Sequence, residues 1–188
     1  MRTTAYLLLS SLFFSCAINI AAQDSSPLTK QRVKLKHKSR IGFKYDKFKD
    51  QTTVRVGPYF MTGGMEYAMT NSQFEMIAAF SVPGQKLVKP VGSVTLAFES
   101  KSKEWKFLNE RNLYALVNGE RLNLGEAVRD SDVRRGGVSE FLSVSVPYET
   151  FIKIANGKTV EMKLGEKEFK LKDEHLEGFR DLASRMVP

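Results

Sequence analysis

The residues that most clearly suggest a chemical function, by type and by spacing, are six cations at alternate positions of one short segment. Every even position from 30 to 40 is basic, and the segment contains no acidic residue. In an extended chain alternate side chains point the same way, so this spacing places all six cations on one face. Such a stripe can bind anionic lipid headgroups, lipopolysaccharide phosphates or acidic polysaccharide. The candidate anion-binding residues are Lys30, Arg32, Lys34, Lys36, Lys38 and Arg40.

Two other interpretations of this segment remain open. It fits a solvated linker, and it fits an edge strand that its lysines protect from aggregation. Nucleic acid would be attracted by the same charge, but no recognition motif accompanies it, and we expect no nucleic-acid partner. The formal net charge of +8 is concentrated here, because the chain outside this segment and Arg2 has 22 basic residues against 21 acidic ones.

The chain is poor in the residue types that most catalytic and metal sites use. It has two histidines, His37 and His175, and one cysteine, Cys16. A catalytic serine would need one of these histidines as its base, and neither accompanies a Gly-x-Ser-x-Gly turn, so we expect both to be ordinary surface histidines. A single cysteine excludes an intrachain disulfide and a cysteine-based zinc site. We expect no catalytic, metal or cofactor site, and the residues favour a binding or structural role over an enzyme.

Further groupings fit ordinary structure better than chemistry. Met61, Met65 and Met69 recur every four residues, a spacing that would suit copper(I), but Gly63-Gly64 disfavours the helix that would align them. Residues 130–132 are similar to the start of a calcium loop but lack the later ligands, and we interpret them as a solvated loop. Paired carboxylates could hydrolyse envelope carbohydrate, and such a hydrolase remains the alternative function.

The first residues have the pattern of a bacterial export signal. Arg2 precedes an uncharged apolar run from Ala5 to Ala22, which is typical of a secretory signal peptide. Cleavage after Ala22 would leave Gln23 as the first residue of a periplasmic or secreted protein. The competing interpretation is a lipoprotein, because residues 12–16 form a loose lipobox that would make Cys16 a lipidation site. An uncut membrane anchor is the third possibility.

Turn signals at short intervals after Gly42 predict a series of strands. The strongest is Asn118-Gly119 between two apolar runs, which is typical of a two-residue hairpin. Two helices are expected, one over Tyr148–Ala155 and a terminal one with Asp173 as its N-cap. The expected strands cover residues 51–56, ended by Gly57-Pro58, and residues 74–82, 93–99, 112–124 as a hairpin, 142–146, 159–164 and 168–171.

These elements predict a mainly β fold: a single β-sandwich or partly open barrel of about eight strands, with a short helix and a C-terminal helix. The sequence contains no alternating series of strands and helices and no repeat. We therefore expect a signal peptide over residues 1–22, a basic and flexible segment over residues 23–41, and one β-rich domain over residues 42–188.

Several segments resemble a group of exported bacterial proteins of unknown function. The likeness rests on residues 45–52, on the segment around Trp105, and on residues 160–165 followed by Glu168-Phe169. It implies an exported β-rich protein and carries over no catalytic residue. The closing order of helix, strand, strand and helix is similar to small periplasmic accessory domains of bacterial secretion systems, although those usually carry disulfide cysteines.

Together these observations predict a non-catalytic binding or structural protein of the cell envelope. Its basic segment would contact anionic lipid or polysaccharide. Another envelope protein remains a possible partner, through an exposed strand edge. The secondary candidates for contact are the aromatic residues Tyr45, Tyr59, Phe60 and Trp105.

Overall fold

The computed structural model describes residues 26–27, 37–134 and 136–187. These residues form a mainly β fold with three helices, the last of them at the C-terminal end, which confirms the predicted fold class. The strands are β1 (Ser26–Pro27), β2 (Ile41–Asp46), β3 (Gln51–Phe60), β4 (Gln73–Pro83), β5 (Lys86–Leu87), β6 (Ser93–Ser102), β7 (Asn112–Val117), β8 (Glu120–Glu126), β9 (Val128–Arg134), β10 (Gly137–Pro147), β11 (Val160–Leu164) and β12 (Lys167–Leu171). The helices are α1 (Gly64–Thr70), α2 (Tyr148–Ala155) and α3 (Asp173–Ser184).

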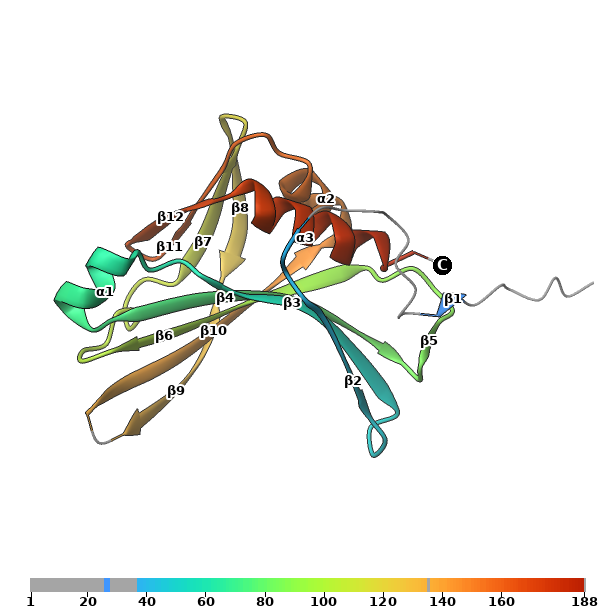
Figure 1. The fold of residues 1–188 in the computed structure, drawn as a ribbon, viewed down its shortest axis with the longest axis horizontal. Helices are drawn as coiled ribbons and strands as arrows, with labels where there is room; N and C mark the ends of the chain where they lie inside the picture. Colours follow the sequence, from blue (N-terminus) through green and yellow to red (C-terminus); the bar gives the residue numbers. More distant parts are fainter. Residues whose placement is uncertain (1–25, 28–36, 135, 188) are drawn as a thin grey trace, which may run out of the picture.

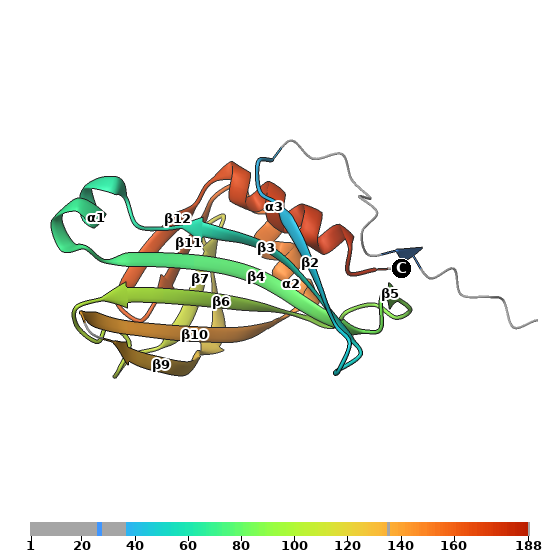
Figure 2. The ribbon, with the colours of Figure 1, turned by 60° about the horizontal axis from the view of Figure 1, so that its bottom comes forward.

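Two antiparallel sheets form the body of the protein (Figure 1). The larger sheet has six strands in the order β2-β3-β4-β6-β10-β9, and the smaller has four in the order β12-β11-β7-β8. The short strands β1 and β5 form a separate pair. Figure 2 shows the six-stranded sheet as a twisted layer, with the smaller sheet and the helices α2 and α3 on one of its faces.

The inner face of the large sheet is covered in two parts. Phe169 of β12 packs against Phe74 of β4 and Phe98 of β6, with ring centroids 5.4 and 6.0 Å away, which joins the two sheets. The helices α2 and α3 cover the rest of this face, α3 against β3 and β4 and α2 against β6 and β10. One continuous apolar core results, and it extends along the chain from Val54 to Met186. The arrangement is a two-sheet sandwich that is completed by helices.

Side-chain alternation explains most of these strands. In β6 the side chains of Val94, Leu96 and Phe98 are buried while their neighbours face outward, as the sequence pattern predicts. The turn between β7 and β8 is formed by Asn118 and Gly119, whose φ angles of 51° and 88° are those that a two-residue hairpin requires. Asn118 also accepts hydrogen bonds at its Oδ1 from the main-chain N–H groups of residues 158 and 159.

The two predicted helices are present with small differences. In α2 the buried side chains are Phe151, Ile154 and Ala155, whereas Ile152 is only partly buried. The terminal helix α3 begins at Asp173, so Lys172 holds the N-cap position that we assigned to Asp173. The N–H of Lys172 donates to Nδ1 of His175 at 3.2 Å, and this contact fixes the first turn.

Two further local predictions are wrong. Gly57-Pro58 does not end a strand, because β3 continues to Phe60 through a bulge that Gly57 allows with its φ of 108°. Residues 130–132 are not a solvated loop but part of the edge strand β9, whose backbone pairs with β10. The strand β2 and the exposed helix α1 are not among the predicted elements. Among the described residues, no helix is both long and apolar enough to cross a membrane.

Candidate functional site

The predicted basic segment meets the fold at its C-terminal end. Lys38 and Arg40 lie within the described residues and are exposed, while the alternate residues His37, Ser39 and Ile41 are partly buried. The predicted alternation therefore holds over residues 37–41. The other candidates, Lys30, Arg32, Lys34, Lys36 and the lipidation candidate Cys16, lie outside the described residues.

His37 ties this segment to the terminal helix. Its Nε2 lies 3.1 Å from Oδ2 of Asp181, and Nε of Arg185 donates to Oδ1 of the same carboxylate at 2.9 Å. The three side chains are at most 5% exposed. The Arg185 guanidinium also lies 5.5 Å from the ring centroid of Phe43 in β2. His37 is thus an anchor in a buried polar cluster, and the expectation of a surface histidine is wrong.

A cleft of about 410 Å³ opens directly beside Lys38 and Arg40. Three segments that are distant in the sequence line it: residues 38–40, residues 57–60 of β3, and Lys172, Glu174 and His175 at the start of α3. Among the described residues, its cations are Lys38, Arg40 and Lys172, and its one acidic side chain is that of Glu174. The cleft therefore combines two of the predicted anion-binding residues with a third cation that sequence reasoning missed.

Two buried rings lie at the inner side of this cleft. Tyr59 and His175 are 6% and 5% exposed, and their ring centroids are 4.5 Å apart. Burial raises the pKa of Tyr59 to about 12 and lowers the pKa of His175, although Glu174 at 3.7 Å opposes the second effect. Both rings are therefore neutral at pH 7, and the cations of the cleft are its lysines and its arginine.

The two histidines of the chain are poorly placed to act as general bases. Nδ1 of His175 already accepts the N–H of Lys172, and Nδ1 of His37 is fully buried with no hydrogen-bond partner among the residues that the structure describes. A base must reach the proton that it removes, directly or through one water. What the cleft offers instead is positive charge beside neutral aromatic rings, which suits phosphate, sulfate or carboxylate groups.

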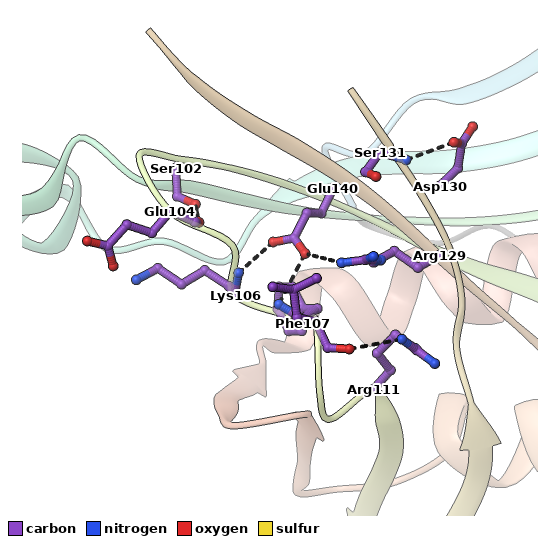
Figure 3. A network of polar contacts seen from close by, with 10 residues as sticks. Ser102, Glu104, Lys106, Phe107, Arg111, Arg129, Asp130, Ser131 and Glu140 are labelled. Carbon is purple, nitrogen blue, oxygen red and sulfur yellow. Dashed lines mark hydrogen bonds and ion pairs between the residues drawn. The ribbon is translucent and has the colours of Figure 1, made fainter. Parts of the chain in front are cut away.

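A second polar centre surrounds Glu140 in β10 (Figure 3). This carboxylate is fully buried, and it accepts hydrogen bonds from the main-chain N–H groups of Lys106 at 2.7 Å and Phe107 at 3.1 Å. Arg129 of β9 lies 3.3 Å from its Oε1 and also stacks 5.1 Å from the ring centroid of Trp105. The three donors satisfy the carboxylate, so its role is to hold the loop between β6 and β7 against the large sheet.

Glutamates meet on two sheet faces. Glu75 of β4 and Glu99 of β6 stand directly opposite each other, and each has a partner, Gln73 for Glu75 and Lys101 for Glu99. Two others lie on the outer face of the small sheet. Glu161 and Glu168 line a shallow cleft there, but each stands opposite a lysine on the neighbouring strand, at the register pairs 161–170 and 163–168. Nζ of Lys163 lies 3.0 Å from Glu168. Opposite charges across a sheet stabilise strand pairing, and this arrangement is typical of a solvent-facing charge ladder. These glutamates are engaged with residues of their own or neighbouring strands, and the hydrolase stays an untested alternative.

The aromatic and methionine candidates are dispersed. Among the aromatic ones, Tyr59 and Phe60 line the cleft, whereas Tyr45 lies in β2 and Trp105 in the loop beside Glu140. Because α1 begins at Gly64, Met61 precedes the helix that carries Met65 and Met69. In the described part of the chain, no three or more histidine, cysteine, aspartate or glutamate side chains are grouped as metal ligands would be.

Sequence signals could not have located Lys172, Tyr59 and His175 in one site. Lys172 follows an ordinary strand, and the two rings read as core or surface residues. They meet because α3 packs on β3 and brings residues 172–175 beside residues 57–60. Comparison of the chain with protein-family models, curated proteins and solved structures found no match. The interpretation of the cleft therefore rests on its own residues and geometry.

Proposed function

We propose that this chain is a non-catalytic binding protein of the bacterial cell envelope. Its ligand carries phosphate or carboxylate groups, displayed by anionic lipid or by an acidic polysaccharide. The observation that supports the proposal is the convergence of Lys38, Arg40 and Lys172 on one cleft, at the point where the basic segment reaches the fold.

The geometry favours binding over catalysis. The three cations come from two segments that the His37–Asp181 contact holds together, so their spacing does not have to be created when a ligand arrives. Within the described part of the chain, Glu174 is the one acidic side chain that lines the cleft.

Export supports the choice of ligand. The pattern of residues 1–22 predicts that the protein is exported from the cytoplasm to the cell envelope. Anionic lipid and glycan are abundant at the envelope. Each cation near an anionic surface contributes about 1 kcal/mol, so three cations account for roughly a hundredfold in affinity. Binding should weaken as salt rises, because exposed charges are screened over about 10 Å at 0.1 M ionic strength.

The test compares two variants with equal loss of charge. One replaces Lys38, Arg40 and Lys172 by glutamine, and the control replaces the exposed residues Lys103, Lys158 and Lys170. Binding is measured by co-sedimentation with vesicles of phosphatidylcholine, with and without phosphatidylglycerol, and by calorimetry with alginate as the soluble acidic polysaccharide.

We expect the cleft variant to lose roughly a hundredfold in affinity for at least one acidic probe, and the control to lose far less. Loss on the vesicles alone indicates a lipid ligand, and loss on alginate indicates a glycan. Equal behaviour of the two variants on both probes would refute the proposal.

A further inference from the structure

A second surface of unusual composition lies at the far end of β2. The hairpin of β2 and β3 projects from the body of the protein, and its turn is formed by residues 47–50 (Figures 1 and 2). Phe48 stands at this turn with 89% of its side chain exposed, more than any other large hydrophobic residue among the described ones. An aromatic ring that is held in water at a protruding turn requires an explanation, since burying it is worth about 1.5–3 kcal/mol.

The turn that carries Phe48 is held in place by its two aspartates. Oδ1 of Asp46 accepts the main-chain N–H groups of Phe48 at 2.9 Å and Lys49 at 3.3 Å. Oδ1 of Asp50 accepts the hydroxyl of Tyr45 at 2.8 Å, and the carbonyl of Asp50 accepts the N–H of Gly84 at 2.7 Å. The ring is therefore presented by a fixed turn, and binding through it costs little conformational entropy.

The charge around the ring is positive. Residues 44–50 and the adjoining residues 84–86 contain four lysines and two aspartates, and both aspartates have a carboxylate oxygen engaged within the turn. Nζ of Lys47 lies 5.1 Å from the centroid of the Phe48 ring. The four exposed lysines of this hairpin tip are Lys44, Lys47, Lys49 and Lys86.

We propose that this hairpin tip docks on an anionic lipid bilayer. Phe48 enters the boundary between headgroups and acyl chains, and the lysines on either side of it remain at the level of the headgroups, with their alkyl stems against apolar surface. Flanking cations favour a bilayer over a protein pocket, because a pocket for an aromatic ring would have to bury charges that a headgroup layer leaves hydrated.

This docking surface is separate from the anion-binding cleft. Arg40 precedes β2 and Phe48 follows it, and the six residues of the strand place roughly 20 Å between its two ends. The inference goes beyond the proposed function and does not depend on it. A protein that rests on a membrane through its hairpin tip could still present the cleft to a second ligand.

The first experiment measures partition onto vesicles of phosphatidylcholine mixed with phosphatidylglycerol. We expect Phe48→Ser to weaken binding at least tenfold, and Lys47→Gln with Lys49→Gln to weaken it roughly thirtyfold, with the second effect disappearing at high salt. The matched control is Met69→Ser, which removes an apolar side chain that is 80% exposed on α1. Equal binding by the Phe48 and Met69 variants would overturn the proposal.

A second measurement follows insertion directly. Phe48→Trp in a Trp105→Phe background places the single tryptophan of the protein at the tip. On anionic vesicles we expect its emission to shift to the blue and to be quenched by brominated acyl chains. The same result with Lys38, Arg40 and Lys172 replaced shows that the tip acts independently of the cleft. Emission that stays water-like while the protein is bound would overturn the inference and leave the proposed function standing.

Discussion

Replacing Gly178 by alanine tests how α3 is seated above the candidate cleft. Gly178 lies in α3 directly over Tyr59, and a Cβ added there would stand 2.0 Å from the Tyr59 hydroxyl oxygen and 3.2 Å from Cγ2 of Val56. The structure therefore predicts that Gly178 is required because the Tyr59 hydroxyl occupies the space that a side chain would need. The hydroxyl, rather than the ring, is the closest obstacle, since Cζ of Tyr59 would be 3.3 Å away.

Two opposing effects determine the magnitude. Glycine to alanine inside a helix ordinarily stabilises by about 1 kcal/mol. Overpacking a rigid core costs about 1–3 kcal/mol, and both Tyr59 and Gly178 are buried. Because the approach of 2.0 Å is severe, we take the upper part of that range, about 2–3 kcal/mol. After subtraction of the helix gain, Gly178→Ala should lower the free energy of unfolding by about 1–2 kcal/mol. In a Tyr59→Phe background the 2.0 Å contact is absent, and the same change should be close to neutral.

The assay is urea unfolding of four proteins, the parent, the two single variants and the double variant, followed by circular dichroism. The expected coupling energy between positions 59 and 178 is at least about 1 kcal/mol. Gly63→Ala is the control, because an added Cβ there has no atom within 4 Å. An equal loss from Gly178→Ala in both backgrounds, or a gain in the parent, would refute the reasoning.

Three further predictions concern buried titratable groups. Glu140→Gln should lower the free energy of unfolding by about 3 kcal/mol, because an amide –NH₂ would face donors that now share a carboxylate. The control Glu126→Gln, at an exposed ion pair, should lower it by less than about 1 kcal/mol. Similar losses for the two variants in denaturant titrations would contradict this prediction. The pKa of Tyr59 is raised to about 12, so the folded state is stabilised by the neutral hydroxyl fully below pH 10 and loses this stabilisation as pH rises toward 12. The free energy of unfolding measured over this range should fall by roughly 2–3 kcal/mol, and this fall should be absent in Tyr59→Phe. The lowered pKa of His175 has the opposite consequence, because the neutral ring stabilises the folded state fully above about pH 6.5 and this stabilisation is lost on acidification. If the free energy of unfolding of a His175→Gln variant fell with acid as much as that of the parent, His175 would be excluded as the cause of the fall.

Local sequence signals identified much of the fold. Val94, Leu96 and Phe98 alternate with outward-facing residues, and alternation of period two is itself the condition for a strand buried on one side. Asn118 and Gly119 marked a hairpin because few other residues tolerate positive φ. In each case the physical cause acts within a few residues, so the sequence alone was sufficient.

Where the local signal was weak or conflicting, tertiary structure decided. Strand β9 contains two arginines and two aspartates and has little apolar pattern, yet its main chain pairs with β10 along its whole length. Gly57 and Pro58 signalled a turn, but β4 continues to pair with β3 on both sides of them, and the strand absorbs the pair as a bulge. Backbone pairing of this kind does not depend on side-chain type.

The candidate site shows the same division. Alternate cations at residues 37–41 could be placed on one side of their segment from residue order, because the period of an extended chain requires it. The burial of His37 against Asp181, 144 residues later, and the position of Lys172 and the Tyr59–His175 pair beside that segment became visible only in the fold. These contacts depend on how α3 packs across β3, and such packing is set by the whole core rather than by neighbouring residues.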